Sequence, residues 1–387
     1  MEPIELRSAV FWEDFRPRVF APPRLGEEAR GLEESLAGKD WARNGVVFAS
    51  SGSSGAPKWV LLCKAALQAS AAMVNRHLGV TGGDHWLLAL PGWHVGGFGV
   101  AARAFEADCG FSVLEGGWDA GRFLEACAKD GATCTSLVPT QVHDLVAAGL
   151  AAPDQLRVVV VGGGGLAEEL GGEARRLGWP VLQSYGMSEA GSQIATAPLD
   201  SLARQFSPIG LQVLPGWEVE TSGGGRLRVR GEALFEGYLS GAGERLGAGL
   251  EEGWFETKDL VSMEAGRLTF LGRRDRTVKI LGELVELDAL ERELTAFAAG
   301  KGEVRVVEVE DGRAGYRLVP VVAGSGEDWE GVVGRFNEGQ PGYARLERAL
   351  VVEDFPRTAL GKPDLEALRS LAAESSPYGL PRGGISN

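Results

Sequence analysis

The sequence contains 387 residues, of which 44% are hydrophobic and 24% charged, and it carries a formal net charge of −14. The length is typical of two or three domains rather than one. The composition is that of a globular protein with enough apolar residues to bury a large core. The acidic balance argues against binding to nucleic acid or to an anionic membrane surface, because both repel a negatively charged protein.

The N-terminus and the cysteines indicate the compartment. Residues 1–15 place acids where a secretory signal has a basic region followed by an apolar run. No stretch reaches the roughly 18 apolar residues of a membrane span. The four cysteines form no C-x-x-C pair, so we expect reduced thiols rather than a zinc site. The sequence therefore predicts a cytoplasmic protein without a membrane span.

Short apolar runs alternate with helical patterns in the first half of the chain. The runs that we expect to form strands are residues 46–50, 85–91, 133–139 and 156–161. The helical patterns between them cover residues 63–79, 123–131 and 167–178. This alternation predicts an α/β fold whose mostly parallel sheet is flanked by helices.

The pattern changes near residue 208. From about 208 to 271 short strand-like runs alternate with turns, which predicts a small β-rich subdomain. A charged segment, 273–276, then precedes further strands and helices, and we place a hinge there. The predicted domains are a large N-terminal domain, 1–272, and a smaller, mobile α+β domain, 273–387.

A loop rich in glycine and serine follows the first predicted strand. Its candidate phosphate-binding residues are Ser50, Ser51, Gly52, Ser53, Ser54, Gly55 and Lys58. Glycines let the backbone approach a phosphate closely, while hydroxyls, N–H groups and an ammonium donate to it. A flexible Ser/Gly linker has the same composition, but a linker has no purpose between an apolar strand and an apolar helix. The loop is not a Walker motif, because Lys58 follows Pro57 and precedes Trp59.

Four further segments accompany this loop in a fixed order. They are Tyr-Gly-Met-Ser-Glu at 185–189, Thr-Lys-Asp at 257–259, the string 272–287 that begins Gly-Arg-Arg-Asp-Arg, and Pro-x-Thr-x-x-Gly-Lys at 356–362. Together the five resemble the signature motifs of the adenylate-forming superfamily, which includes acyl-CoA synthetases, peptide-synthetase adenylation domains and luciferases. The resemblance covers most of the chain. It departs from the family at Lys258, where the family has glycine, and at the front, where the N-terminal domain is shorter than usual.

The resemblance implies a role for each matching residue. Ser188 and Glu189 would hold Mg²⁺, and Tyr185 with Gly186 would contact adenine beside Gly163 and Gly164. Asp259 and Arg273 would bind the ribose and phosphates, Gly282 would line a pantetheine channel, and Asp275 would be the hinge. Lys362 would stabilise the charge that develops during adenylation.

One segment has a rival interpretation. Gly162-x-Gly164-x-x-Ala167 matches a dinucleotide-binding fingerprint, with a strand before it and a helix after it. That would imply a nicotinamide enzyme. The acid expected about 20 residues later should end a second strand, whereas Glu189 lies inside the Tyr-Gly-Met-Ser-Glu segment.

The acyl side of the site is suggested by two segments. His94, in a Pro-x-x-His-x-x-Gly turn that resembles one in the family, would line the acyl pocket and take part in catalysis. Residues 184–196 look most like the o-succinylbenzoate–CoA ligases of menaquinone synthesis. In that case Ser192 and Gln193, with Gly186 and Met187, would contact a second carboxylate or keto group of the substrate.

The predicted activity is an ATP-dependent carboxylate–CoA ligase that forms an acyl-AMP intermediate, with o-succinylbenzoate as the substrate. The enzyme would use ATP and Mg²⁺ and take CoA as the acceptor. A homodimer is possible on this interpretation. The alternatives are another aryl- or acyl-CoA ligase, a stand-alone adenylation enzyme, a nicotinamide-dependent oxidoreductase and a catalytically silent binding protein.

Overall fold

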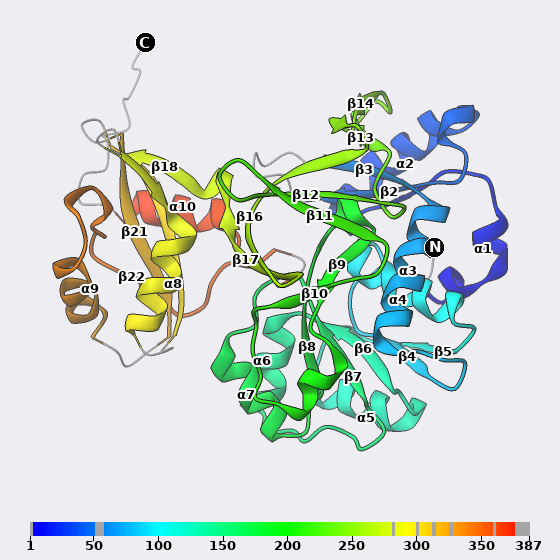
Figure 1. The fold of residues 1–387 in the computed structure, drawn as a ribbon, viewed down its shortest axis with the longest axis horizontal. Helices are drawn as coiled ribbons and strands as arrows, with labels where there is room; N and C mark the ends of the chain where they lie inside the picture. Colours follow the sequence, from blue (N-terminus) through cyan, green and yellow to red (C-terminus); the bar gives the residue numbers. More distant parts are fainter. Residues whose placement is uncertain are drawn as a thin grey trace, which may run out of the picture. The chain divides into compact units, whose positions relative to one another are not determined.

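A computed structural model describes residues 3–50, 58–280, 283–298, 302–311, 315–324, 328–358 and 361–375 (Figure 1). The chain divides into two compact units. The first comprises residues 1–257 and 261–270, and the second comprises 258–260 and 271–387. Lys258, Asp259 and Leu260 thus join the second unit, although the predicted boundary at 272 placed them in the first.

The first unit contains a sheet that is parallel at one end and antiparallel at the other. The parallel part is ordered β5-β4-β6-β7-β8, with β4 at His85–Leu88, β5 at Gly110–Val113, β6 at Cys134–Leu137, β7 at Val158–Val161 and β8 at Val181–Met187. Its helices are α3 (Lys64–Leu78), α4 (Val95–Glu106), α5 (Ala120–Asp130), α6 (Pro139–Ala147) and α7 (Glu168–Arg176). The predicted α/β class is confirmed.

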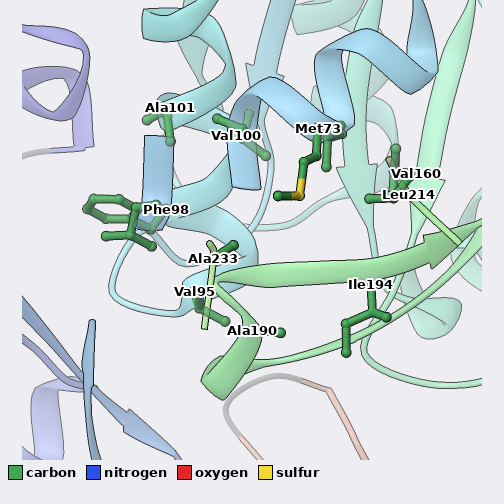
Figure 2. Packing of buried hydrophobic residues seen from close by; sticks show 14 of the residues in the cluster. Met73, Val95, Phe98, Val100, Ala101, Val160, Ala190, Ile194, Leu214 and Ala233 are labelled. Atoms are coloured by element: carbon green, nitrogen blue, oxygen red, sulfur yellow. The ribbon is translucent and has the colours of Figure 1, made fainter. Parts of the chain in front are cut away.

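Strand β7 shows why both faces of this sheet are covered. Val158 and Val160 pack in one core cluster with α3 and α4, whereas Val159 and Val161 pack in another with α5, α6 and α7. Successive side chains of a strand point to opposite faces, so an unbroken run of valines requires helices on both sides. Figure 2 shows part of the first cluster, which includes Met73, Phe98, Val160 and Ile194.

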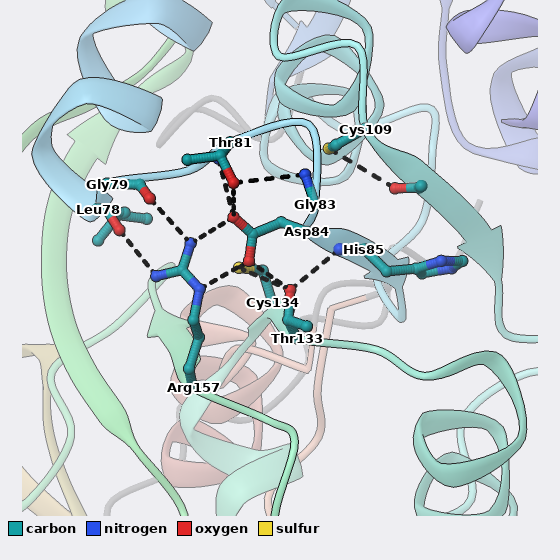
Figure 3. Close-up of polar contacts among 11 residues, drawn as sticks. Leu78, Gly79, Thr81, Gly83, Asp84, His85, Cys109, Thr133, Cys134 and Arg157 are labelled. Carbon is teal, nitrogen blue, oxygen red and sulfur yellow. Dashed lines mark hydrogen bonds and ion pairs between the residues drawn. The ribbon is translucent and has the colours of Figure 1, made fainter.

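A polar network ties together the starts of three parallel strands (Figure 3). The Arg157 guanidinium forms an ion pair with buried Asp84 at 2.7 Å and donates to the Leu78 carbonyl at 2.9 Å. Thr133 donates to Asp84 at 2.7 Å. Burial opposes ionisation of Asp84, but the hydrogen bonds from Arg157, Thr81 and Thr133 outweigh it and hold its pKa well below the usual range. This network lies at the end of the strands opposite to the loops that carry the motifs.

The antiparallel end of the sheet contains most of the strands between residues 208 and 271. Its strands are β9 (Ser192–Thr196), β10 (Leu211–Val213), β11 (Trp217–Ser222), β12 (Arg226–Gly231), β15 (Leu250–Glu251), β16 (Trp254–Glu264) and β17 (Arg267–Arg273). A separate sheet, β1-β2-β3-β13-β14, consists of Arg18–Phe20, Gly45–Ser50, Lys58–Cys63, Gly237–Leu239 and Arg245–Gly247. Helices α1 (Ala9–Glu13) and α2 (Gly26–Leu36) lie in the N-terminal segment.

The second unit is α+β. Its strands are β18 (Thr277–Ile280), β19 (Glu283–Glu286), β20 (Glu303–Asp311), β21 (Gly315–Ala323) and β22 (Leu350–Val352), and its helices are α8 (Leu287–Phe297), α9 (Trp329–Glu338) and α10 (Leu365–Glu374). On β20, Val304 and Val306 face the cluster formed with α8 and α9, while Val307 and Val309 face α10. Among the described residues, no helix is long and apolar enough to cross a membrane.

Candidate active site

The predicted phosphate loop joins two paired strands. Ser50 at the end of β2 lies opposite Lys58 at the start of β3, and its hydroxyl donates to the Lys58 carbonyl at 3.4 Å. The remaining candidates of this loop, Ser51, Gly52, Ser53, Ser54 and Gly55, lie outside the described residues. The antiparallel pairing therefore fixes where the loop leaves and re-enters the fold.

Glu189 and Lys58 are brought together by a residue that the sequence analysis did not select. The Tyr238 hydroxyl donates to Glu189 Oε1 at 2.8 Å, and the Lys58 ammonium lies 5.5 Å from the centre of the Tyr238 ring. Tyr238 is on β13, which pairs with β3 so that Tyr238 is opposite Val60. Residues far apart in the chain thus meet at the start of β3.

Glu189 and Ser188 fit a magnesium ion that arrives with ATP. Within the described ranges, no group of three or more His, Cys, Asp or Glu side chains is placed to hold a metal. Mg²⁺ bound to nucleotide phosphates is usually held by one or two carboxylates, with phosphate oxygens and water completing the shell. Glu189 with neighbouring Ser188, both half-buried in a short 3-10 turn after β8, matches that pattern.

The glycine loop after β7 is held from the neighbouring strand. The buried Gln183 side chain accepts from the Leu166 amide at 2.7 Å and donates to the Gly164 carbonyl at 3.1 Å. Ser184 donates to the Val161 carbonyl at 3.0 Å. Gly163 adopts a positive φ of 77°, a conformation that glycine adopts without strain. Gly163 and Gly164 are consequently exposed on a loop of fixed shape.

Gly186 allows two strands to approach closely. A Cβ at this position would lie 1.6 Å from the Ser192 carbonyl oxygen, so only glycine fits there. The pairing of β8 with β9 shifts register between Tyr185 and Gly186. The Tyr185 ring stacks on Phe270 with a centroid distance of 5.8 Å, which places an aromatic pair at the predicted adenine position.

His94 caps the N-terminus of α4. Its Nδ1 accepts from the Gly96 amide at 3.1 Å, so in the neutral ring the proton is on Nε2. A Cβ on Gly97 would lie 2.2 Å from the Pro91 carbonyl oxygen, which explains the glycine that ends this turn.

Arg103 is the main functional candidate that the sequence analysis missed. Its side chain is only 2% exposed, on the inner face of α4. It donates to Ser136 Oγ and to Ser192 Oγ, both at 3.1 Å, and its guanidinium lies 5.3 Å from the Trp86 ring centre. In the described part of the chain no carboxylate pairs with it. Burial lowers its pKa to about 10, so it stays charged at neutral pH.

Ser192 and Gln193 differ in surroundings. Ser192 is half-buried and has a positive φ of 132°, which is rare for a residue with a side chain and is typical of functional sites. Gln193 is 4% exposed, and its side chain accepts a short hydrogen bond from Thr196. The hydroxyl beside Arg103, rather than the amide, is therefore available to a ligand.

In the second unit, the predicted ribose and hinge residues form one charged cluster. Arg273 donates to Asp259 at 3.2 Å and to both oxygens of Asp275 at 2.8 and 2.9 Å. Lys258 lies 3.3 Å from Asp275, which accounts for a charged residue where the family has glycine. Burial opposes ionisation of Asp275, but Arg273 and Lys258 outweigh it and hold its pKa at about 2.

Lys362 follows a tight turn. The Thr358 amide donates to the Lys362 carbonyl at 2.8 Å, and Gly361 has a φ of 72°. Loss of hydration lowers the pKa of Lys362, as does the nearby Arg273, while Asp259 opposes the change. Gly282, the predicted pantetheine residue, lies outside the described residues.

With this geometry established, comparison with known proteins identifies the family. A model of the AMP-binding enzymes matches residues 40–239. The chain belongs to the AMP-binding enzyme family. The resemblance predicted from the motifs is confirmed, and the glycine loop at 162–165 is part of an AMP-binding enzyme rather than of a nicotinamide enzyme.

Within this family, the chain is similar to ligases that act on 2-succinylbenzoate. A "Probable 2-succinylbenzoate--CoA ligase" from Mycobacterium tuberculosis is 32% identical over 85% of this chain and 85% of its own length. The structure of o-succinylbenzoate CoA synthetase from Bacillus subtilis with its acyl-adenylate intermediate is 25% identical, with a TM-score of 0.71 over 84% of this chain and 68% of that one. The same enzyme with ATP and magnesium ion gives a TM-score of 0.70, at 25% identity over 84% of this chain and 69% of that one.

Proposed function

We propose that the chain is an AMP-forming ligase that converts 2-succinylbenzoate and CoA to the CoA thioester through an acyl-adenylate. Arg103 is the residue that favours a dicarboxylate substrate. In the part of the chain that the structure describes, the buried Arg103 guanidinium has no carboxylate partner, which is unfavourable in the unliganded protein. A substrate with a second carboxylate would supply the missing charge. Ser192, hydrogen-bonded to Arg103 and half-buried, is the group that would contact this carboxylate, directly or through a bridging water.

In the first half-reaction a substrate carboxylate oxygen attacks the α-phosphorus of ATP, the bond to pyrophosphate breaks, and acyl-AMP forms. Lys58 and the phosphate loop would hold the leaving phosphates, and Lys362 would stabilise the charge that develops at the α-phosphate. Glu189 with Ser188 would hold Mg²⁺, which when bound neutralises phosphate charge.

The remaining groups hold the nucleotide and the acyl chain. Asp259 and Arg273 would grip the ribose, and Tyr185 would contact adenine beside the glycine loop. His94, with the proton on Nε2, would line the acyl pocket together with Met187.

In the second half-reaction the CoA thiol attacks the acyl carbonyl and AMP leaves. The second unit is proposed to reorient at Asp275, so that Lys362 serves the first step and Gly282 the second. A cytoplasmic location, predicted from the sequence, is part of the proposal. The competing possibility is a ligase for another aryl acid, which would not require the charge of Arg103.

Product analysis tests the proposal. The purified chain is incubated with ATP, Mg²⁺, CoA and a panel of acids, and AMP and thioesters are measured by mass spectrometry. The proposal requires equal amounts of AMP and 2-succinylbenzoyl thioester, with slower turnover of benzoate and of aliphatic monoacids. Turnover of the monoacids in preference to 2-succinylbenzoate would reject the substrate, and AMP without thioester would indicate a different acceptor.

A further inference from the structure

Tyr238 contacts two candidate residues of the nucleotide site, Glu189 and Lys58. Its hydroxyl donates to one oxygen of Glu189, Oε1, at 2.8 Å. Among the described residues, no hydrogen bond is formed by the other oxygen, Oε2. A carboxylate held by one oxygen presents the second in a fixed direction, which is the arrangement a divalent cation needs from a single protein ligand.

The hydroxyl is not needed to hold the backbone at this point. The Phe235 amide already donates to the Glu189 carbonyl at 2.9 Å, and the Glu236 amide donates to the Leu61 carbonyl at 2.8 Å. The Phe235 ring also packs edge-on against Tyr238 at 4.9 Å. The segment 235–238 is thus fixed independently, and the Tyr238–Glu189 hydrogen bond orients the carboxylate specifically.

The same ring also faces the phosphate loop. The Lys58 ammonium lies 5.5 Å from the centre of the Tyr238 ring, within the range in which a cation is attracted to an aromatic face. Because Tyr238 on β13 is paired with Val60 on β3, its side chain lies beside Lys58 at the start of β3. One side chain therefore contacts both the candidate metal ligand and the loop lysine.

We propose that Tyr238 is a positioning residue that orients Glu189 toward the magnesium ion of Mg–ATP. This inference rests on the proposed function, because it assigns the second oxygen of Glu189 to that ion. It adds a residue of β13, in the same sheet as β2 and β3, to the nucleotide site.

Tyr238→Phe removes the hydrogen bond to Glu189 but keeps the ring that faces Lys58, so it tests the hydroxyl alone. The readout is the rise in melting temperature of the intact chain at fixed ATP as Mg²⁺ is titrated. Loss of a hydrogen bond to a charged group predicts about a tenfold higher half-saturating Mg²⁺ concentration, with the melting temperature without ligand little changed. Tyr316→Phe, on β21 of the second unit, is the matched control and should leave the titration unchanged.

A second background distinguishes orientation of Glu189 from a general structural effect. In Glu189→Gln the carboxylate on which Tyr238 acts is gone, so adding Tyr238→Phe should change the Mg²⁺ requirement by less than about twofold. An equal effect of Tyr238→Phe in both backgrounds would overturn the positioning role, as would an unchanged Mg²⁺ requirement in the single variant while the wild type responds normally. A wild type whose melting does not respond to ATP with Mg²⁺ would refute the proposed function together with this inference.

Discussion

Replacing Arg103 with methionine should separate stability from substrate recognition. Methionine fills a similar apolar volume but carries no charge. The fall in the pKa of Arg103 from 12.5 to about 10 corresponds to about 3 kcal/mol by which burial disfavours the charged form. Against this gain, Ser136 and Ser192 each lose a hydrogen-bond donor, at about 1 kcal/mol each. We expect the free energy of unfolding to be unchanged or raised by about 1 kcal/mol.

Whereas the free energy of unfolding should be unchanged or raised, kcat/KM for 2-succinylbenzoate should fall in the same variant. A carboxylate contacting Ser192 would lie about 7 Å from the guanidinium, where two unit charges attract by about 2 kcal/mol at an effective dielectric constant near 20. Losing this attraction predicts a fall of about thirtyfold in kcat/KM for 2-succinylbenzoate. Two monocarboxylate analogues, each lacking one of the two carboxylates, provide the comparison. The analogue without the carboxylate that does not react with ATP has no charge to place near Arg103. Its kcat/KM should therefore change little in the variant.

The assay pairs urea unfolding with kcat/KM for pyrophosphate release. Arg175→Met is the matched control, because Arg175 is a partly buried arginine whose described side-chain hydrogen bonds are all to backbone carbonyls, among them Val181 at 3.0 Å. It should destabilise the protein without changing the preference among acids. An Arg103→Met variant that keeps full preference for 2-succinylbenzoate would refute the assignment of the buried charge to the substrate.

Three further outcomes follow from the contacts described above. Lys362→Ala should abolish adenylation yet spare thioester formation from supplied acyl-AMP, as measured in the two half-reactions; equal loss of both would contradict its role. Asp84→Asn should lower the free energy of unfolding by about 3 kcal/mol in urea, because it leaves Arg157 without its charged partner, while the KM for ATP stays constant. Asp275, whose pKa is held at about 2 against 3.8, contributes about 2 kcal/mol that is fully present above pH 3.8 and lost as the pH falls toward 2. The acid sensitivity of unfolding should therefore weaken in Asp275→Asn, and an unchanged pH profile would count against the cluster with Arg273.

The sequence was informative wherever a local pattern determines local structure. Apolar runs alternating with helical patterns predicted the mostly parallel sheet flanked by helices, and the ordered motifs predicted the family. Gly186 and Gly97 could be located by motif because each lies where a side chain would collide with a backbone carbonyl. These features depend on neighbours in the chain or on a close backbone approach that only glycine permits.

Arg103, Tyr238 and Gln183 were missed because their partners are distant in the chain. Arg103 meets Ser192 across 89 residues and Tyr238 meets Glu189 across 49, and no sequence spacing encodes those contacts. One signal was present for Arg103, since it is the only charged residue in α4 before the final glutamate, and a lone arginine on an apolar helix must find a buried partner or a ligand. Lys258 shows the converse, because a departure from the family motif became interpretable only with its contact to Asp275.

An isotope transfer experiment tests the central claim most directly. 2-Succinylbenzoate labelled with ¹⁸O in its carboxylates is converted in the presence of ATP, Mg²⁺ and CoA, and the AMP is analysed by mass spectrometry. If a carboxylate oxygen attacks the α-phosphorus, that oxygen stays on AMP when the thiol displaces it, so each AMP should carry one ¹⁸O. AMP without label, formed together with thioester, would contradict the acyl-adenylate route.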